Sequence, residues 1–393
     1  MTTNPHIFII AAEKSGDELG AKLARELRKQ TGDAVTLSAI GGSALEAEGL
    51  ESPIDISPLS ILGFLEGVKS YPVIMERVRQ TTDFIIKSGA DAVVLIDSWG
   101  FMARVAKRLK KLGYAGEIIK YVAPQVWAMR EGRSKVLAGL VDHLLTIHAF
   151  DAPYFTKHGL NTIYVGNPIL DENYSAGHGT ALRTEYNIAP DTPVLTMLFG
   201  SRLSEIQKLA EPFAAAVQIL KQEVPGLAIV APVSDTITED VLAAAAKHPE
   251  LQNVIMLGED RKLDCFAVAD VAIACSGTVT SQLASAGVPT VVGYKLNGLT
   301  YMIASRMYKP DYMSIVNIAA DALLMPEFMQ KDCSGENLSA AALVYLNDKN
   351  KREVASQALT QQVAKMRRGK NSKSSEHSSA RAARAVLSIL TCD

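Results

Sequence analysis

The sequence predicts an α/β fold built from two doubly wound parallel sheets. Strand-like apolar runs alternate with helical patterns along the chain, which is typical of βαβ units. These runs form two groups, separated by a polar stretch over residues 171–193. The chain has 393 residues, of which 48% are hydrophobic, and this is enough to bury two cores. Two domains of similar size are therefore expected.

The first domain is expected to span residues 1–170. Between its first two strands, Leu19, Leu23 and Leu27 recur at four-residue intervals, which predicts one apolar face of a helix over 16–31. Its predicted strands are 7–12, 36–40, 92–97, 118–122, 144–148 and 162–165.

The second domain is expected to span residues 194–337. Residues 171–193 are rich in Asn, Gly, Ser, Thr and Pro and are predicted to be a linker. The helical tail over 338–393 is expected to pack back on the first domain. In such folds ligands bind at the carboxyl ends of the strands and in the cleft between domains. The predicted strands of the second domain are 194–198, 227–231, 254–257, 271–274 and 290–292.

The composition excludes several classes of protein. A net charge of −2 gives no electrostatic footprint for nucleic acid. No apolar run reaches the ~18 residues needed to span a bilayer, and residues 1–6 lack the features of a signal peptide. No histidine pair has metal-ligand spacing, so no metal site is expected. The cysteines have no CxxC spacing and are predicted to be reduced thiols of a cytoplasmic protein; they are Cys265, Cys275, Cys333 and Cys392.

Two short loops have the character of anion-binding sites. Residues 274–278 and 198–202 each follow an apolar strand, carry hydroxyl groups and open a helix. The free N–H groups and positive dipole of a helix start attract anions. Two such loops in one half, with Arg202 in the first, indicate a site for a bound diphosphate. Ordinary βα turns are the alternative, since Ser and Gly are common there.

Acidic side chains follow two strands of the first domain. Asp97 ends a very apolar strand, at the edge where substrates bind in parallel sheets, and is predicted to be a general base. Capping of the next helix is its alternative role. Glu13, Ser15 and Asp17 follow the first strand, and the alternative for them is a capped helix start.

Two further strand ends carry polar or aromatic groups. Gln125, Trp127 and Arg130 follow the strand over 118–122, and Asn167 follows the last strand of this half. Trp127 is predicted either to pack on a sugar face or to fill the core.

The segment over 61–78 is unusually apolar for a connection between strands. It predicts one of two structures. The first is a helix packed on the sheet, and the second is an exposed apolar patch that docks on a membrane or receives acyl chains. Basic side chains in the same half would favour an anionic surface, or form the solvated face of a helix; they are Lys107, Arg108, Lys110 and Lys111.

Taken in order, these motifs resemble the lipid-A-disaccharide synthase family over nearly the whole chain. The single motifs are short, but their full series and spacing are specific. The matching positions are Glu13-x-Ser15-Gly16-Asp17, Leu62-Gly63-x-x-Glu66, Ile96-Asp97, Pro124-x-Val126-Trp127-Ala128-x-Arg130, Gly200-Ser201-Arg202-x-x-Glu205, Ser276-Gly277-Thr278, Val291-Val292-Gly293-Tyr294-Lys295, Asp311-Tyr312-x-Ser314, Asn317 and Pro326-Glu327-x-x-Gln330.

The resemblance implies a GT-B fold with a deep interdomain cleft and an inverting glycosyl transfer. A 2,3-diacylglucosamine unit would pass from UDP to the 6-hydroxyl of 2,3-diacylglucosamine 1-phosphate. The products would be a β-1,6-linked disaccharide 1-phosphate and UDP. Neither a cofactor nor a metal is implied, and the chain contains no Asp-x-Asp triplet. The enzyme would lie on the anionic cytoplasmic face of the inner membrane, and a homodimer is left open.

The resemblance also assigns roles to single residues. Asp97, Glu13 and Arg202 would be catalytic, with Asp97 as the base and Arg202 at the leaving diphosphate. The second domain would hold UDP and its sugar. The residues expected to bind substrate are Ser15, Asp17, Glu66, Gln125, Trp127, Arg130, Asn167, Ser201, Glu205, Ser276, Gly277, Thr278, Gln282, Tyr294 and Asn317.

The chain departs from the family pattern in four places. Ala12 and Phe199 stand where the family has Gly and Pro, and Gln282 stands where it has a Glu that would bind ribose. After Asp97 the family continues Ala-Pro-Asp-Phe-Asn, whereas residues 98–102 here lack that second Asp and the Asn. A divergent member is therefore expected. The alternatives are another GT-B enzyme, such as a UDP-sugar epimerase, or a catalytically silent binding protein.

Overall fold

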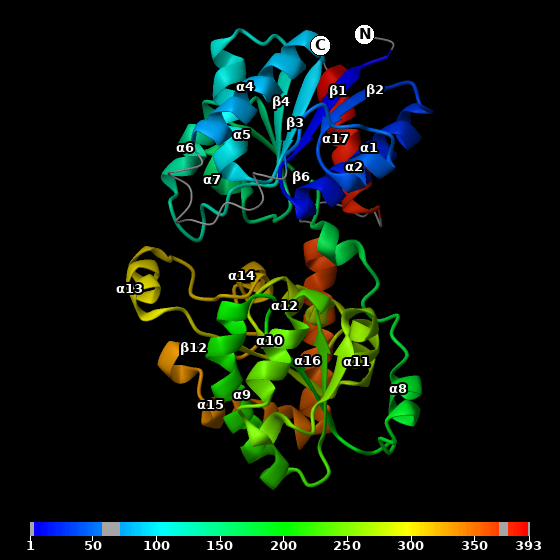
Figure 1. The fold of residues 1–393 in the computed structure, drawn as a ribbon, viewed down its shortest axis with the longest axis vertical. Coiled ribbons are helices and arrows are strands. Elements are labelled where there is room, and N and C mark those ends of the chain that lie inside the picture. Colours follow the sequence, from blue (N-terminus) through cyan, green and yellow to red (C-terminus); the bar gives the residue numbers. More distant parts are fainter. Residues whose placement is uncertain (1–3, 57–70, 369–375, 392–393) are drawn as a thin grey trace. The chain divides into compact units, whose positions relative to one another are not determined.

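The computed structural model describes residues 4–56, 71–368 and 376–391. These residues form two compact units (Figure 1). Unit 1 contains residues up to Pro168 and the C-terminal segment from Arg368, and unit 2 runs from Ile169 to Arg367. The strands predicted from the sequence are all present, and the α/β fold class is confirmed.

Unit 1 is a parallel sheet in the order β2-β1-β3-β4-β5-β6, with helices on both faces. The side chains of β1 alternate between these faces: Ile7 and Ile9 pack with α1 and α17, whereas Phe8 and Ile10 pack with α4 and α5. The elements are β1 (His6–Ala11), α1 (Lys14–Thr31), β2 (Thr36–Ile40), α2 (Ser43–Ala47), α4 (Tyr71–Ser88), β3 (Ala92–Ile96), α5 (Trp99–Lys111), β4 (Glu117–Tyr121), α6 (Gly132–Ala138), β5 (His143–Thr146), α7 (Ala152–Thr156), β6 (Asn161–Tyr164) and α17 (Ser378–Thr391).

Unit 2 repeats this plan with the order β12-β11-β10-β7-β8-β9. One face packs on α9, α10 and α15, and the other on α11, α12 and α16. The short edge strand β12 was not predicted, because three residues give no readable alternation. The elements are α8 (Gly179–Glu185), β7 (Val194–Leu198), α9 (Leu203–Glu223), β8 (Ala228–Val233), α10 (Thr238–Ala245), β9 (Ile255–Gly258), α11 (Lys262–Val268), β10 (Val271–Cys275), α12 (Thr278–Ser285), β11 (Thr290–Tyr294), α13 (Gly298–Met307), α14 (Ile315–Ala320), β12 (Glu327–Met329), α15 (Gly335–Leu346) and α16 (Lys349–Arg368).

The expected linker over 171–193 is a folded part of unit 2. Helix α8 packs on α11, and the backbone N–H of His178 donates to Asp264 at 2.6 Å. At Gly177 an added Cβ would lie 1.9 Å from the Leu263 carbonyl oxygen. The polar composition hides these anchors, because Leu182 is the only fully buried apolar side chain among the described residues of α8.

The helical tail divides between the two units rather than packing on the first. Helix α15 lies against α9 in unit 2, and α16 buries Leu359 and Val363 among residues of that unit. Only α17 belongs to unit 1. It packs along α1, where Gln30 Nε2 donates to the Ala380 carbonyl at 2.8 Å.

Candidate active site

Both sheets have a topological switch point, and the predicted site loops lie there. In unit 1, β1 and β3 are neighbours, with Ala11 opposite Ile96. The helices that follow them, α1 and α5, cover opposite faces. In unit 2, β7 and β10 are neighbours, with Leu198 opposite Ala274, and α9 and α12 cover opposite faces. When the connections after two neighbouring strands run to opposite faces, they leave a crevice at the carboxyl ends of those strands. In α/β proteins ligands bind in such crevices.

In unit 1 the switch point is lined by Glu13, Ser15 and Asp97. Glu13 and Ser15 are exposed at the start of α1, and Asp97 is half-buried at the end of β3. Asp97 has a φ of 49° and Ser98 a φ of 37°, which is a left-handed conformation that favours glycine. The Asp97 N–H donates to the Tyr121 carbonyl at 2.9 Å. The turn that presents Asp97 is therefore fixed by the neighbouring strand.

The loop after β4 separates the predicted residues into surface and interior. Gln125 and Arg130 are exposed, and Arg130 has a φ of 58°. The Trp127 indole is buried and makes an edge contact with Phe150, with ring centroids 5.3 Å apart. It also faces the buried Asp151 carboxyl, whose pKa burial raises to about 8, while the Trp127 N–H acts in the opposite direction. Of the two predicted roles, Trp127 therefore fills the core.

The end of β6 is shaped by Gly166 and Asn167. Gly166 has a φ of 92°, and an added Cβ would lie 2.0 Å from the Arg381 guanidinium of α17. Asn167 is buried. The side chain of Asn167 therefore belongs to the interior of this turn rather than to its surface.

In unit 2 the loop after β7 is closed by Glu205. The Ser201 N–H donates to the Glu205 carboxylate at 3.0 Å, and Arg202 pairs with it at 3.2 Å. At Gly200, with a φ of 106°, an added Cβ would lie 2.5 Å from a Glu205 oxygen. Glu205 thus acts as an internal tie of the loop. The Arg202 side chain remains 76% exposed and is available to a ligand.

The loop after β10 presents backbone at the same edge. Gly277 and Thr278 are exposed at the start of α12, and an added Cβ at Gly277 would meet nothing within 4 Å. Tyr294, at the end of β11, lies near enough to Glu205 and Arg202 for their charges to act on its pKa, which burial raises. The ends of β7, β10 and β11 therefore bring an exposed guanidinium, a helix start and a phenol together.

Sequence comparison gives the same family. A family model described as "Lipid-A-disaccharide synthetase" matches residues 7–383. The chain belongs to this family. The lipid-A-disaccharide synthase of Paramagnetospirillum magneticum (strain ATCC 700264 / AMB-1) is 38% identical over 368 residues, which cover 93% of this chain and 94% of that relative. The expectation of a glycosyltransferase is thereby confirmed.

Solved structures agree on the fold. A putative UDP-N-acetylglucosamine 2-epimerase from Listeria monocytogenes aligns with a TM-score of 0.64 at 14% identity, covering 98% of this chain and 96% of that one. A glycosyltransferase from Rickettsia africae ESF-5 aligns with a TM-score of 0.59 at 9% identity, covering 99% and 100%. At such identities the likeness shows the GT-B fold alone. It does not favour the epimerase alternative.

Two residues predicted to bind substrate in this synthase-family chain make several internal hydrogen bonds. Both Asp17 carboxylate oxygens accept N–H groups at the start of α2, from Gly42 and from Ala44, each at 2.8 Å. The Asn317 side chain is fully buried. Its amide donates to the Met325 carbonyl and to Glu327, each at 2.8 Å, and its oxygen accepts the N–H groups of Leu324 and Met325. Each side-chain oxygen and nitrogen of both residues therefore has an internal partner.

Replacing Asn317 by alanine should lower the free energy of unfolding by about 2–4 kcal/mol, because several buried backbone groups and the Glu327 carboxylate lose a partner. Urea unfolding measures the loss, and UDP titration of the folded variant should give an unchanged Kd. Exposed Asn253→Ala is the control and should change stability by no more than about 0.5 kcal/mol. Normal stability with weakened UDP binding would instead support the prediction that Asn317 contacts the ligand.

The remaining predicted residues have these positions. Gln282 is half-buried and hydrogen-bonds with Tyr174, and Ser276 is half-buried at the end of β10. Glu66 and the first part of the apolar segment lie outside the described residues. Among those that are described, no cluster of His, Cys, Asp and Glu could hold a metal ion. Cys265, Cys275 and Cys333 are free and buried, and Cys392 is outside the described residues.

Three residues to which the sequence assigned no role organise these loops, although Glu327 and Gln330 stand in one of the family motifs. Glu327 accepts the N–H groups of Met313 and Ser314, each at 2.7 Å. Gln330 accepts the Leu296 N–H at 2.6 Å, just beyond Tyr294. Lys120 lies beneath Asp97 and is fully buried in β4. A lysine inside an apolar strand was the one readable signal for the third.

A hollow of about 580 Å³ lies at the amino ends of the unit 1 strands, opposite the ends that carry the candidate site. Its lining includes Asp91, just before β3, and Glu117, the first residue of β4. Residues of α17 also line it. Ligands of parallel sheets bind at the carboxyl ends of strands. This hollow is therefore separate from the candidate site.

Proposed function

We propose that this enzyme transfers 2,3-diacylglucosamine from UDP to the 6-hydroxyl of 2,3-diacylglucosamine 1-phosphate, releasing UDP and a β-1,6-linked disaccharide 1-phosphate. The observation that carries the proposal is the family match over residues 7–383, which includes the loops at both switch points. Both proposed substrates carry the acyl chains that the family name implies for the product.

Unit 2 is proposed to bind the UDP-sugar. The diphosphate would lie against the exposed N–H groups that open α12 and the Arg202 guanidinium, with Ser201 and Tyr294 beside it. Negative charge develops on the leaving phosphate as the glycosidic bond breaks. Fixed donors aimed at that charge stabilise the transition state more than the ground state.

Unit 1 is proposed to activate the acceptor. Asp97 would take the proton of the 6-hydroxyl as its oxygen attacks the anomeric carbon from the side opposite UDP, which inverts the configuration. Glu13 and Ser15, across the same switch point, would orient the acceptor. Proton transfer of this kind typically contributes about 10²–10⁴-fold to rate.

The proposed reaction is tested by incubating the purified protein with UDP-diacylglucosamine and diacylglucosamine 1-phosphate and detecting a disaccharide 1-phosphate by mass spectrometry. The reaction should proceed equally in EDTA, because protein dipoles and Arg202 are proposed to replace a divalent cation. A parallel incubation without acceptor detects the epimerase alternative as a new UDP-sugar. Absence of disaccharide with both substrates present would overturn the proposal.

Membrane contact is proposed for the first turns of α4. Tyr71, Val73 and Met75 are 52%, 45% and 37% exposed, an unusual density of apolar side chains on a surface helix. The basic side chains expected to assist are partly committed elsewhere: Arg108 pairs with Asp83 of α4, and Lys110 with Asp142. No helix in the described part of the chain has the length and apolarity needed to cross a bilayer.

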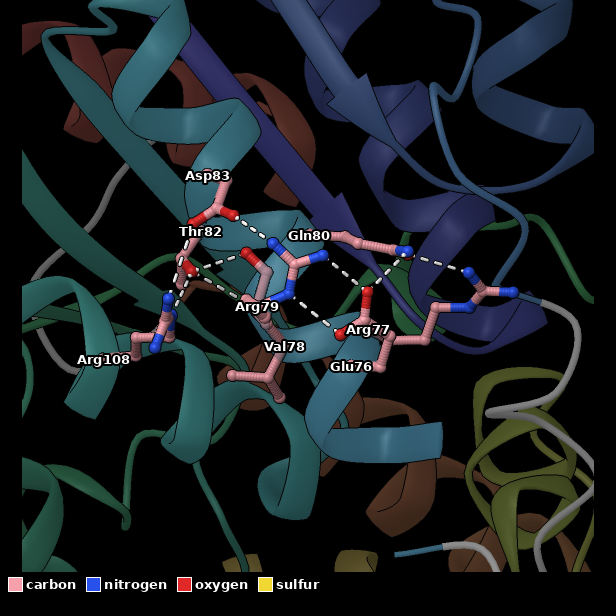
Figure 2. A network of polar contacts seen from close by, with 8 residues as sticks. All are labelled: Glu76, Arg77, Val78, Arg79, Gln80, Thr82, Asp83 and Arg108. Atoms are coloured by element: carbon pink, nitrogen blue, oxygen red, sulfur yellow. Dashed lines mark hydrogen bonds and ion pairs between the residues drawn. The ribbon is translucent and has the colours of Figure 1, made fainter. Parts of the chain in front are cut away.

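The rest of α4 makes polar contacts within the helix and with α5. Figure 2 shows Arg79 between Glu76 and Asp83, and Arg108 of α5 donating to Thr82 at 2.8 Å. Of these contacts, those of Arg108 with Thr82 and Asp83 join α4 to α5, and the others lie within α4.

Changing Tyr71, Val73 and Met75 together to serine should weaken binding to phosphatidylglycerol vesicles at least about tenfold, because their apolar area no longer leaves water on docking. Cosedimentation measures the bound fraction. Val136→Ser on α6, a position 52% exposed, is the matched control and should bind as the wild type does. Equal binding by the triple variant would remove α4 from the proposed contact.

A further inference from the structure

Lys120 is a fully buried lysine at the centre of the unit 1 sheet, with 2% of its surface exposed. It lies opposite Leu95 in the β3–β4 register. Its ammonium donates to the carbonyl oxygens of Leu95 at 3.2 Å, Asp97 at 2.6 Å and Tyr121 at 3.0 Å. An ammonium has three N–H donors, and these carbonyls engage all of them. Burying a lysine is costly, so such a residue calls for an explanation.

The carbonyls that Lys120 binds border strained backbone at two strand ends. Asp97 and Ser98 have φ values of 49° and 37°, and Val122, next to Tyr121, has a φ of 71°. Positive φ is rare for residues other than glycine and is especially unfavourable for a β-branched side chain. Such conformations cost about 1–3 kcal/mol each and persist only where the surroundings enforce them. The bonds of Lys120 add to the backbone bonds that hold these residues, from the Asp97 N–H to Tyr121 and from the Val122 N–H to Leu145.

The charge of Lys120 is matched by two carboxylates of the candidate site. Asp97, from β3, and Glu13, from the β1–α1 loop, both act on it electrostatically. Burial lowers the pKa of Lys120 to about 7, and these two negative charges act in the opposite direction. A neutral amine has only two N–H donors, so its lone pair would face a carbonyl oxygen. Loss of the proton therefore loosens the turn at Asp97.

We propose that Lys120 is a positioning residue for Asp97: its ammonium holds the strained Asp97–Ser98 turn and offsets the negative charge of the two carboxylates, so that Asp97 faces the acceptor in a fixed geometry. The proposal rests on the proposed function of Asp97. Lys120 itself touches no substrate, because its donors are occupied by backbone. Small displacements of a reacting group reduce rates about 10²-fold per ångström, so a loosened turn lowers kcat.

The first test is Lys120→Met, which keeps an unbranched side chain one atom shorter and removes its charge and donors. We expect kcat to fall about 10–100-fold while KM for the UDP-sugar stays within about twofold, because unit 2 is unaltered. Adding Ser98→Gly to this variant should restore at least part of the loss, since glycine adopts the left-handed turn without strain. Ser98 makes no side-chain cap to α5, so this change removes no such bond. Lys29→Met, at a 73% exposed position of α1, is the control.

The second test is the pH dependence of kcat. As pH rises through about 7 the wild type loses the Lys120 proton, so its kcat should decline on the alkaline side, and this decline should be absent in Lys120→Met. If Lys120→Met does not fold, the kcat of Lys120→Gln and the pH dependence of the wild-type kcat test the proposal. A kcat within twofold of wild type, or a loss with neither rescue nor altered pH profile, overturns the proposal. A wild type that makes no disaccharide overturns the proposed function instead.

Discussion

Asp97→Asn should lower kcat for disaccharide formation by about 10²–10⁴-fold, because the amide cannot accept the proton of the attacking hydroxyl. The amide keeps the size of the side chain, and the turn is held through backbone groups, the Asp97 N–H to Tyr121 and the Asp97 carbonyl to Lys120. The fold of unit 1 should therefore persist. UDP binding, proposed for unit 2, should be unchanged within about twofold by titration calorimetry.

The control for this variant is Asp33→Asn, at an exposed loop position with a φ of 66°. Asparagine tolerates that conformation, so activity and stability should both stay near the wild type. Thermal unfolding of Asp97→Asn shows whether the turn survives. A kcat within tenfold of the wild type would falsify the assignment of Asp97 as the base.

Arg202→Ala should lower kcat by about 10²–10³-fold, the usual effect of removing one donor from a developing negative charge. The side chain is 76% exposed and pairs only with Glu205 among the contacts of the described residues. Glu205 keeps its bond to the Ser201 N–H, so the loop should remain closed. The kcat of Arg202→Lys should lie between those of the wild type and Arg202→Ala, because lysine keeps the charge but lacks the planar guanidinium.

Binding measurements with UDP and with uridine show which part of the nucleotide Arg202 contacts. Arg202→Ala should weaken UDP at least about tenfold while uridine, which lacks the diphosphate, binds as before. Lys262→Ala, which removes an exposed pair with Glu259 in the same unit, is the control and should change neither. Equal loss for UDP and uridine would mean that Arg202 contacts the nucleoside or supports the fold.

The sequence alone predicted every described strand except β12, their division into two sheets and the loops at both switch points. Local patterns suffice for this, because apolar runs and turn residues report secondary structure over short distances. The same local signal misled at 171–193, where polar composition indicated a linker and a few buried anchors decided otherwise. The tail over 338–393 was expected to pack on the first domain, but only α17 does so. Helical periodicity predicts a helix and does not identify its packing partner.

Only the tertiary structure showed which polar side chains bind the backbone. Asp17, Glu205 and Asn317 stand in motifs of the family, and each accepts a backbone N–H group. Lys120 had no place in any motif, and its ammonium meets the Asp97 carbonyl only because β3 and β4 pair in one register. The order of residues along a chain determines which strands and turns form. Hydrogen-bond partners depend on which of those turns the packed sheet brings within about 3 Å, and residues far apart in sequence decide that together.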